Sequence, residues 1–199
     1  MSNDNTLKNL QTALQMEMTA AHQYQLHAHV LDDWGLDLLA AQMREEMQEE
    51  IGHSDQFIER IMFLNGKPEV AFAKQPRAAS SLEDMFKADL ADEEEAIRFY
   101  TAAAQQAGEV GDIGSRTLFE QIVLDEEGHK SWLEQQLSLI KRLGEQAYSA
   151  KFVSGAQAGN GSAEYLSSIR PGRRWKTRPA WSGPCRNHHT SELIEIKEC

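Results

Sequence analysis

The sequence predicts an all-α fold, a four-helix bundle with one long crossover, a short fifth helix and an irregular C-terminal tail. Along four long segments, apolar residues recur at steps of three and four, the spacing of an amphipathic helix. The first and third breaks between these segments are short, whereas the second break is much longer, as in a bundle with a single crossover. No segment with a β-strand period is comparably strong.

The first two segments predict a helical hairpin. An apolar stripe runs over residues 7–31, and residues 32–35, which end in glycine, interrupt it. A second stripe runs over 36–64. Asparagine, glycine, lysine and proline follow it at 65–68, a strong signal for the end of a helix.

The third and fourth segments predict a second hairpin. Ser80 or Ser81 can cap a helix whose stripe runs over 82–104, with acidic residues in its first turn. A break with glycines at 108–114 separates it from a fourth stripe at 118–140.

The chain is expected to divide after the bundle. A short fifth helix is predicted from about residue 144 to residue 153, so we predict a helical domain at 1–158 and a basic tail at 159–199. From residue 160 onward there are seven basic and four acidic residues, which leaves a charge of −14 on residues 1–159. The tail lacks helix or strand periodicity. It is interpreted as a read-through artefact or as a targeting or docking extension.

Composition excludes several classes of protein. The 199 residues include 31 acidic and 20 basic ones, a net charge of −11 that argues against nucleic-acid binding. There is no apolar run long enough for a membrane helix and no signal peptide pattern. The two cysteines, Cys185 and Cys199, exclude a disulfide framework or a four-cysteine metal site. We therefore expect a cytoplasmic protein with no membrane association.

Each apolar stripe is interrupted by residues that can bind metals. They are Glu17 in the first stripe, Glu50 and His53 in the second, Glu93 in the third, and Glu126 and His129 in the fourth. In each Glu-x-x-His pair the two side chains share one helix face. Glu17 and Glu50 are 33 residues apart, as are Glu93 and Glu126, so the two hairpins read as copies related by a pseudo-two-fold axis.

This pattern favours a site for two metal ions. Buried ionised carboxylates are costly unless they are paired, and two divalent ions would neutralise four glutamates. The imidazoles would add one neutral nitrogen ligand for each ion, and mixed ligation of this kind suits iron or manganese. The alternative is a solvated charged face, since Glu93 lies in an acidic run at 92–95. The repeated arrangement favours the metal site.

With these motifs the sequence resembles the bacterioferritin branch of the ferritin-like superfamily. The resemblance covers about residues 5–158 and includes the stretches HSDQFIERIMFLNGKP and LIKRLGEQAYSAKFV. It implies two irons bridged by Glu50 and Glu126, with Glu17 and His53 completing one position and Glu93 and His129 the other. Tyr24 matches the family's tyrosine beside this centre, and Trp132 an aromatic residue near it.

The resemblance implies iron storage and detoxification. A ferroxidase would oxidise Fe(II) with O2 or H2O2, and the product would be stored as mineral in a homo-oligomeric shell of 24 subunits. Two irons per subunit are expected, with manganese or zinc as alternatives. Haem is not expected, because Ile51 stands where the family has its haem-binding methionine.

Three other functions are alternatives. A rubrerythrin-like peroxidase usually has a four-cysteine iron module, which this chain cannot build. A di-manganese catalase would release O2 from peroxide, and a non-enzymatic helical interaction module would bind no stoichiometric metal.

Some polar residues near the motifs have weaker assignments. Glu49 and Asp125 each lie four residues before a predicted ligand histidine and are either outer carboxylates that hold the imidazoles or surface charges. His22, His27 and His29 lie off the ligand stripe and are predicted at the surface or an interface.

Overall fold

A computed structural model describes residues 4–155 of the chain, all helix, turn and loop. The helices are α1 (Asp4–Asp33), α2 (Asp37–Phe63), α3 (Leu82–Glu109), α4 (Ile113–Leu143) and α5 (Glu145–Ser149), followed by a 3-10 turn at Ala150–Phe152. This confirms the predicted all-α bundle with a short fifth helix. None of the described helices is both long and apolar enough to cross a membrane. The predicted tail at 159–199 and its boundary lie outside the described residues.

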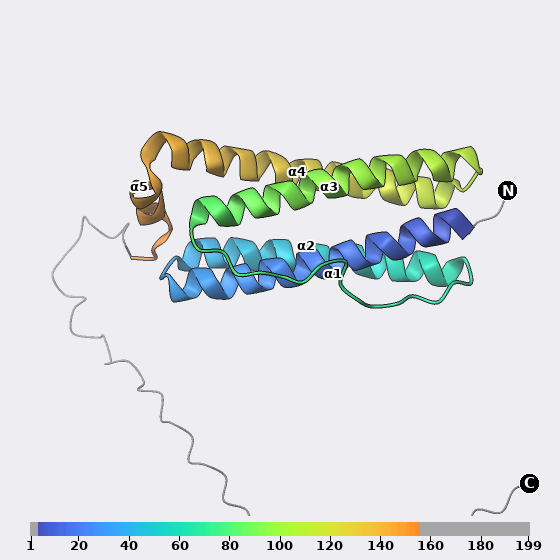
Figure 1. The fold of residues 1–199 in the computed structure, drawn as a ribbon, viewed down its shortest axis with the longest axis horizontal. Helices are drawn as coiled ribbons and strands as arrows, with labels where there is room; N and C mark the ends of the chain where they lie inside the picture. The colour runs from blue at the N-terminus through green and yellow to red at the C-terminus, as the bar shows by residue number, and fades with distance from the viewer. Residues whose placement is uncertain (1–3, 156–199) are drawn as a thin grey trace, which may run out of the picture. The chain divides into compact units, whose positions relative to one another are not determined.

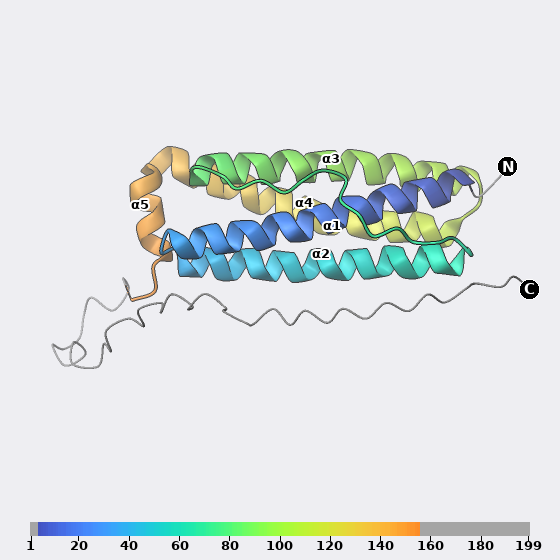
Figure 2. The ribbon, with the colours of Figure 1, turned by 60° about the horizontal axis from the view of Figure 1, so that its bottom comes forward.

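The four long helices form two antiparallel hairpins packed against each other (Figure 1). Helices α1 and α2 form one hairpin and α3 and α4 the other, so α2 and α3 run in the same direction. The connection between them therefore returns along the length of the bundle, beside α1 (Figure 2). Helix α5 turns across the end of the bundle where α4 finishes.

Helix ends follow the local signals in the sequence. Helix α2 ends before Asn65, which has a left-handed backbone (φ 60°). Gly66 follows, where a Cβ atom would lie 2.8 Å from a side-chain carbon of Leu7, so a larger residue would require neighbouring side chains to shift. Ser81 caps α3 by accepting a hydrogen bond from the Asp84 amide (3.1 Å), as predicted for one of the two serines.

Side chains of α1 hold the crossover by bonding to its backbone. Gln11 and the backbone of Glu69 exchange two hydrogen bonds of 2.7 and 2.9 Å. Gln23 does the same with the backbone of Arg77 at 2.8 Å. Thr19 accepts from the amide of Ala73 between them (2.9 Å). The crossover is therefore fixed to one helix of the first hairpin.

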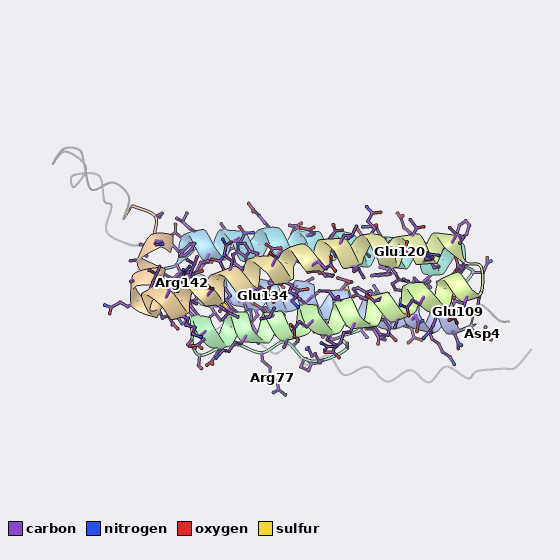
Figure 3. The ribbon with its side chains drawn as sticks, turned by 90° about the horizontal axis from the view of Figure 1, so that it is seen from above. Asp4, Arg77, Glu109, Glu120, Glu134 and Arg142 are labelled. Atoms are coloured by element: carbon purple, nitrogen blue, oxygen red, sulfur yellow. The ribbon has the colours of Figure 1, made fainter. Side chains whose placement is uncertain are left out.

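The apolar core consists of two clusters of buried residues. One lies toward α5 and includes Leu31, Leu39, Met43, Phe86, Leu133 and Tyr148. The other lies toward the opposite end and includes Leu10, Leu14, Phe57, Ile61, Tyr100, Phe119 and Ile122. On each of the four long helices, the predicted metal-binding residues lie between the residues of one apolar cluster and those of the other. Charged side chains cover the outside of the bundle: Arg77 projects away from it (Figure 3), and Glu120, Glu134 and Arg142 are exposed.

Candidate metal centre

The six predicted ligands converge in the middle of the bundle. We call them the Glu/His cluster: Glu17 of α1, Glu50 and His53 of α2, Glu93 of α3, and Glu126 and His129 of α4. All six side chains are buried, with at most 9% of any side chain exposed. Each helix carries its polar residue where its apolar stripe faces the bundle axis, so packing of the stripes brings the carboxylates together.

His53 lies among three carboxylates from three helices. Its Nδ1 atom is 3.2 Å from Glu50 Oε2, with hydrogen-bond geometry. The same nitrogen lies 3.6 Å from Glu17 Oε2 and 3.6 Å from Glu126 Oε1. These four residues can each offer one ligand atom, and the four atoms lie within 4.8 Å of one another.

His129 occupies the equivalent position in the second hairpin. Its Nδ1 atom is 3.0 Å from Glu126 Oε2, 3.4 Å from Glu50 Oε1 and 3.9 Å from Glu93 Oε1. These four residues form a second group with ligand atoms within 4.8 Å. The two groups share Glu50 and Glu126, whose oxygens lie between the two histidines.

Burial and mutual repulsion disfavour ionised carboxylates in the cluster. Burial raises the pKa of Glu50, and the charge of Glu17 raises it further. The pKa of Glu93 is raised well above its usual value by burial and by Glu126 and Glu50. Burial and Glu50 also raise the pKa of Glu126. In the absence of cations these groups therefore retain protons more readily than exposed glutamates.

The two histidines are instead held in the charged form. Burial lowers the pKa of His53, but hydrogen bonds and charge from Glu17 and Glu50 outweigh it and raise the pKa to about 11. For His129 the effect of burial is likewise exceeded by Glu126 and Glu50, so its pKa also rises well above the usual value. Two imidazolium ions thus offset part of the carboxylate charge.

Two buried tyrosines hydrogen-bond to the outer glutamates. The hydroxyl of Tyr24 donates to Glu93 Oε1, which brings this predicted residue to the cluster. The hydroxyl of Tyr100 donates to Glu17 Oε1. Burial raises the pKa of both phenols, and the carboxylates raise it further, so both are neutral donors. Tyr100 was missed by the sequence analysis, although it follows Glu93 at the interval that separates Tyr24 from Glu17.

The outward nitrogens of the histidines face a second set of carboxylates. His129 Nε2 lies 3.1 Å from Glu46 Oε2 and 3.5 Å from Glu49 Oε2, without hydrogen-bond geometry. His53 Nε2 lies 3.5 Å from Asp125 Oδ2. Glu49 and Asp125 therefore both lie beside a histidine of the cluster, as expected for outer carboxylates. The carboxylate nearest to His129 Nε2, however, is that of Glu46. The sequence contained one sign of this role, because Glu46 lies within the second apolar stripe and so faces the inside of the bundle.

A cavity of about 220 Å³ connects the cluster with the surface between α1 and α3. The four glutamates and Tyr100 line its inner part, whereas Lys74 of the crossover lies with two acidic residues at its outer part. The Lys74 ammonium pairs with Asp92 and lies 3.8 Å from Glu95 Oε2, both on α3. Lys74 is half exposed, so this part of the cavity lining borders solvent.

Four residues with assignments outside the cluster occupy different environments. The prediction of a surface or interface position for His27 was wrong, because its ring is fully buried with Nδ1 3.0 Å from Asp89 Oδ2. His29 is exposed and His22 is half-buried against Phe72. Trp132 is half-buried and packs edge-on against Phe86, in the cluster toward α5.

The donor set fits two divalent cations. Glu50 Oε1 is buried without a hydrogen-bond partner, an arrangement that is costly unless a cation or proton occupies its lone pairs. Four carboxylates and two imidazoles would balance the charge of two divalent ions once the histidines lose their protons. Iron, manganese and zinc all accept such ligands.

Comparisons with known proteins agree with this geometry. The ferritin-like domain family matches residues 7–143. Bacterioferritin of Rhodobacter capsulatus is 42% identical over 139 residues, which cover 70% of this chain and 86% of the relative. Bacterioferritin BfrA of Mycobacterium tuberculosis is 38% identical over 148 residues, covering 74% of this chain and 93% of the relative.

Solved structures of bacterioferritins also resemble this chain. The structure of Rhodobacter capsulatus bacterioferritin, described with a metal-free dinuclear site and haem iron, superposes with a TM-score of 0.75 at 36% identity. The match covers 81% of this chain and 99% of that chain. BfrA from Mycobacterium tuberculosis superposes with a TM-score of 0.75 at 37% identity, covering 77% and 96%.

Proposed function

Because the chain belongs to the ferritin-like family, with bacterioferritins as its relatives, we propose that it oxidises Fe(II) at the Glu/His cluster and stores the product. Iron storage is the function that this membership supports. The oxidation step rests on one observation, the convergence of the six buried carboxylate and imidazole side chains.

In this proposal the two overlapping groups of ligands bind one iron each. Glu50 and Glu126 would contribute to both positions, because both residues belong to both groups. Glu17 and His53 complete one position, and Glu93 and His129 complete the other. The two positions have equivalent ligands because the two helical hairpins repeat the same arrangement of glutamate and histidine residues. Manganese or zinc would satisfy the same ligands, so the choice of iron rests on the family.

The protein side chains supply positioning and charge balance. The iron supplies the redox chemistry: two Fe(II) substrate ions would give up one electron each, and with two protons these electrons would reduce O2 to H2O2 or H2O2 to two water molecules. The carboxylates stabilise the higher charge of the Fe(III) product, and their negative charge thereby favours oxidation. The cavity between α1 and α3 gives a neutral oxidant a route to the glutamates. The neutral phenols of Tyr24 and Tyr100 hold the outer carboxylates in place.

Storage requires an assembly, and we propose a homo-oligomeric shell of 24 subunits in the cytoplasm. Apolar side chains are strongly exposed where α2 ends and α4 begins, namely Met62, Phe63 and Ile113. Exposed apolar groups in such proximity are typical of subunit interfaces. We propose that the shell lacks haem, because the side chain of Ile51 on the outer face of α2 has no atom that can bind haem iron.

Substitution of the ligands tests this function. We expect Glu17→Ala and His129→Ala to abolish rapid Fe(II) oxidation, measured by absorbance of Fe(III), while the helix content stays unchanged by circular dichroism. The exposed His29 is a matched control, and His29→Ala should oxidise iron at the unsubstituted rate. Unchanged kinetics in both ligand variants would contradict the proposal.

Metal analysis separates the alternatives. Two irons per chain and strong anomalous scattering at the iron edge, located between His53 and His129, are expected. Rapid O2 release from peroxide by the manganese form would favour a di-manganese catalase. Rapid reduction of peroxide by an external donor would favour a rubrerythrin-like peroxidase. Absence of stoichiometric metal would favour an interaction module.

A further inference from the structure

The two tyrosines at the cluster are related by the internal repeat. Tyr24 follows Glu17 by seven residues on α1, and Tyr100 follows Glu93 by seven residues on α3. Seven residues are about two helical turns, so each tyrosine shares a face with the glutamate of its own helix. The hydrogen bonds nevertheless cross between helices, because α1 and α3 run in opposite directions (Figure 2). Tyr24 binds Glu93, and Tyr100 binds Glu17.

Surrounding aromatic rings hold the ring of Tyr100. Its centroid lies 5.8 Å from that of Phe57 and 6.0 Å from that of Phe119. The residue is 1% exposed. A ring packed in this way cannot swing its hydroxyl away from Glu17 without disturbing the core.

The two oxygens of Glu17 have different partners because Tyr100 donates its hydrogen bond to only one of them. Oε1 accepts from Tyr100, whereas Oε2 is the oxygen 3.6 Å from His53 Nδ1. In the other half of the cluster, Oε1 of Glu93 both accepts from Tyr24 and lies nearest to His129 Nδ1, at 3.9 Å. Only Tyr100 therefore selects which oxygen of its glutamate faces a histidine.

We propose that Tyr100 is a positioning residue for the metal position formed by Glu17 and His53. It fixes the carboxylate so that one defined oxygen is presented to the ion, and Tyr24 restrains Glu93 at the other position. The inference rests on the proposed function, because it assumes that the cluster binds two ions. Partners that orient metal ligands in this way typically contribute about 10-fold to 100-fold to metal affinity.

The role of Tyr100 can be measured in variants that retain only one of the two metal positions. His129→Ala weakens the second position and leaves the one formed by Glu17 and His53, and His53→Ala does the reverse. The metal-free full chain is titrated with Zn(II) by calorimetry and with Co(II) by visible absorption. In the His129→Ala background we expect Tyr100→Phe to weaken Zn(II) binding about 10-fold to 100-fold. It should also alter the Co(II) spectrum, whereas Tyr24→Phe should leave both unchanged.

The reciprocal background and a remote tyrosine provide controls. In His53→Ala, Tyr100→Phe should leave the Zn(II) affinity and the Co(II) spectrum unchanged. Tyr24→Phe should have a smaller effect there than Tyr100→Phe has in His129→Ala, because the hydrogen bond from Tyr24 does not select which oxygen of Glu93 faces His129. Tyr148 is also fully buried and donates a hydrogen bond to Gln136 (3.0 Å), but it lies in the cluster toward α5. Tyr148→Phe should therefore cost similar thermal stability without changing metal affinity in either background.

The outcomes separate this inference from the function on which it rests. Equal effects of Tyr100→Phe in both backgrounds, or none beyond that of Tyr148→Phe, would overturn the positioning role while leaving a two-ion centre intact. If the unsubstituted chain binds no Zn(II) or Co(II), the proposed function fails and the positioning role fails with it.

Discussion

Metal binding is expected to displace protons from the Glu/His cluster. The perturbation is the addition of two Zn(II) ions per chain to the metal-free protein at pH 7. With a pKa of about 11, His53 is protonated at this pH, and His129 is protonated for the same physical reason. A histidine must lose its proton before it binds a metal. Two protons per chain should therefore be released, and Glu93, whose pKa is also raised well above its usual value, adds up to one more.

The pH dependence follows from this proton count. The metal-free form binds more protons than the loaded form, so a lower pH favours the former and a higher pH the latter. Displacement of the two histidine protons raises the product of the two binding constants about 100-fold per pH unit, or about 2.7 kcal/mol, and a proton from Glu93 would make the dependence steeper. This slope applies while both histidines are protonated in the metal-free form, which for His53 means below about pH 11.

Calorimetry in buffers of different ionisation enthalpy measures the proton count directly. The observed heat varies with the buffer in proportion to the protons released. His53→Ala should release about one proton fewer, because one histidine is missing, whereas His29→Ala should leave the count unchanged. Binding of two ions with fewer than one proton released would refute the reasoning. It would mean that the histidines are neutral beforehand or are not ligands.

Three further outcomes can be checked by simpler measurements. Asp112 caps α4 through the Ser115 amide (3.0 Å) and pairs with Arg60, so Asp112→Ala should cost about 1 to 2 kcal/mol and lower the melting temperature by about 2 to 8 °C in calorimetric scans. Lys74→Met should speed removal of bound zinc by a chelator about two-fold to five-fold, because the exposed pair with Asp92 is worth at most about 1 kcal/mol. Deletion of residues 161–199 should leave folding and iron oxidation intact, and loss of soluble protein would contradict it.

The sequence was sufficient for the fold because its signals are local. Apolar stripes, the Asn65–Gly66 stop and the serine cap each act within a few residues, and the unequal breaks indicated the single crossover. The path of the crossover could not be predicted in this way. It depends on Gln11 and Gln23 bonding to backbone that lies more than 50 residues away in the sequence. Amide side chains on a helix carry no sign of such distant partners.

The candidate site was visible for a different reason. Its carboxylates interrupt apolar stripes and repeat at one interval, so their burial had to be explained by a ligand. Tyr100 carried no such anomaly, because an aromatic residue fits an apolar stripe. His27 was misjudged because its partner Asp89 lies 62 residues away, and two polar residues that satisfy each other look like surface residues when read singly. Tyr100 and His27 each pair with a residue of another helix, and such pairs become visible only once the fold is known.

Protons explain how the bundle tolerates this polar layer in its core. Four carboxylates alone would carry four negative charges, but two imidazolium ions offset half of them and the raised pKa of Glu93 favours a proton on a third group. Apolar clusters on both sides stabilise the helices independently of the layer. In the proposed centre, loading with metal would exchange one set of positive charges for another instead of burying new charge. We therefore expect the geometry of the ligands, which the hydrogen bonds from Tyr24 and Tyr100 restrain, to determine how tightly each proposed position binds an ion.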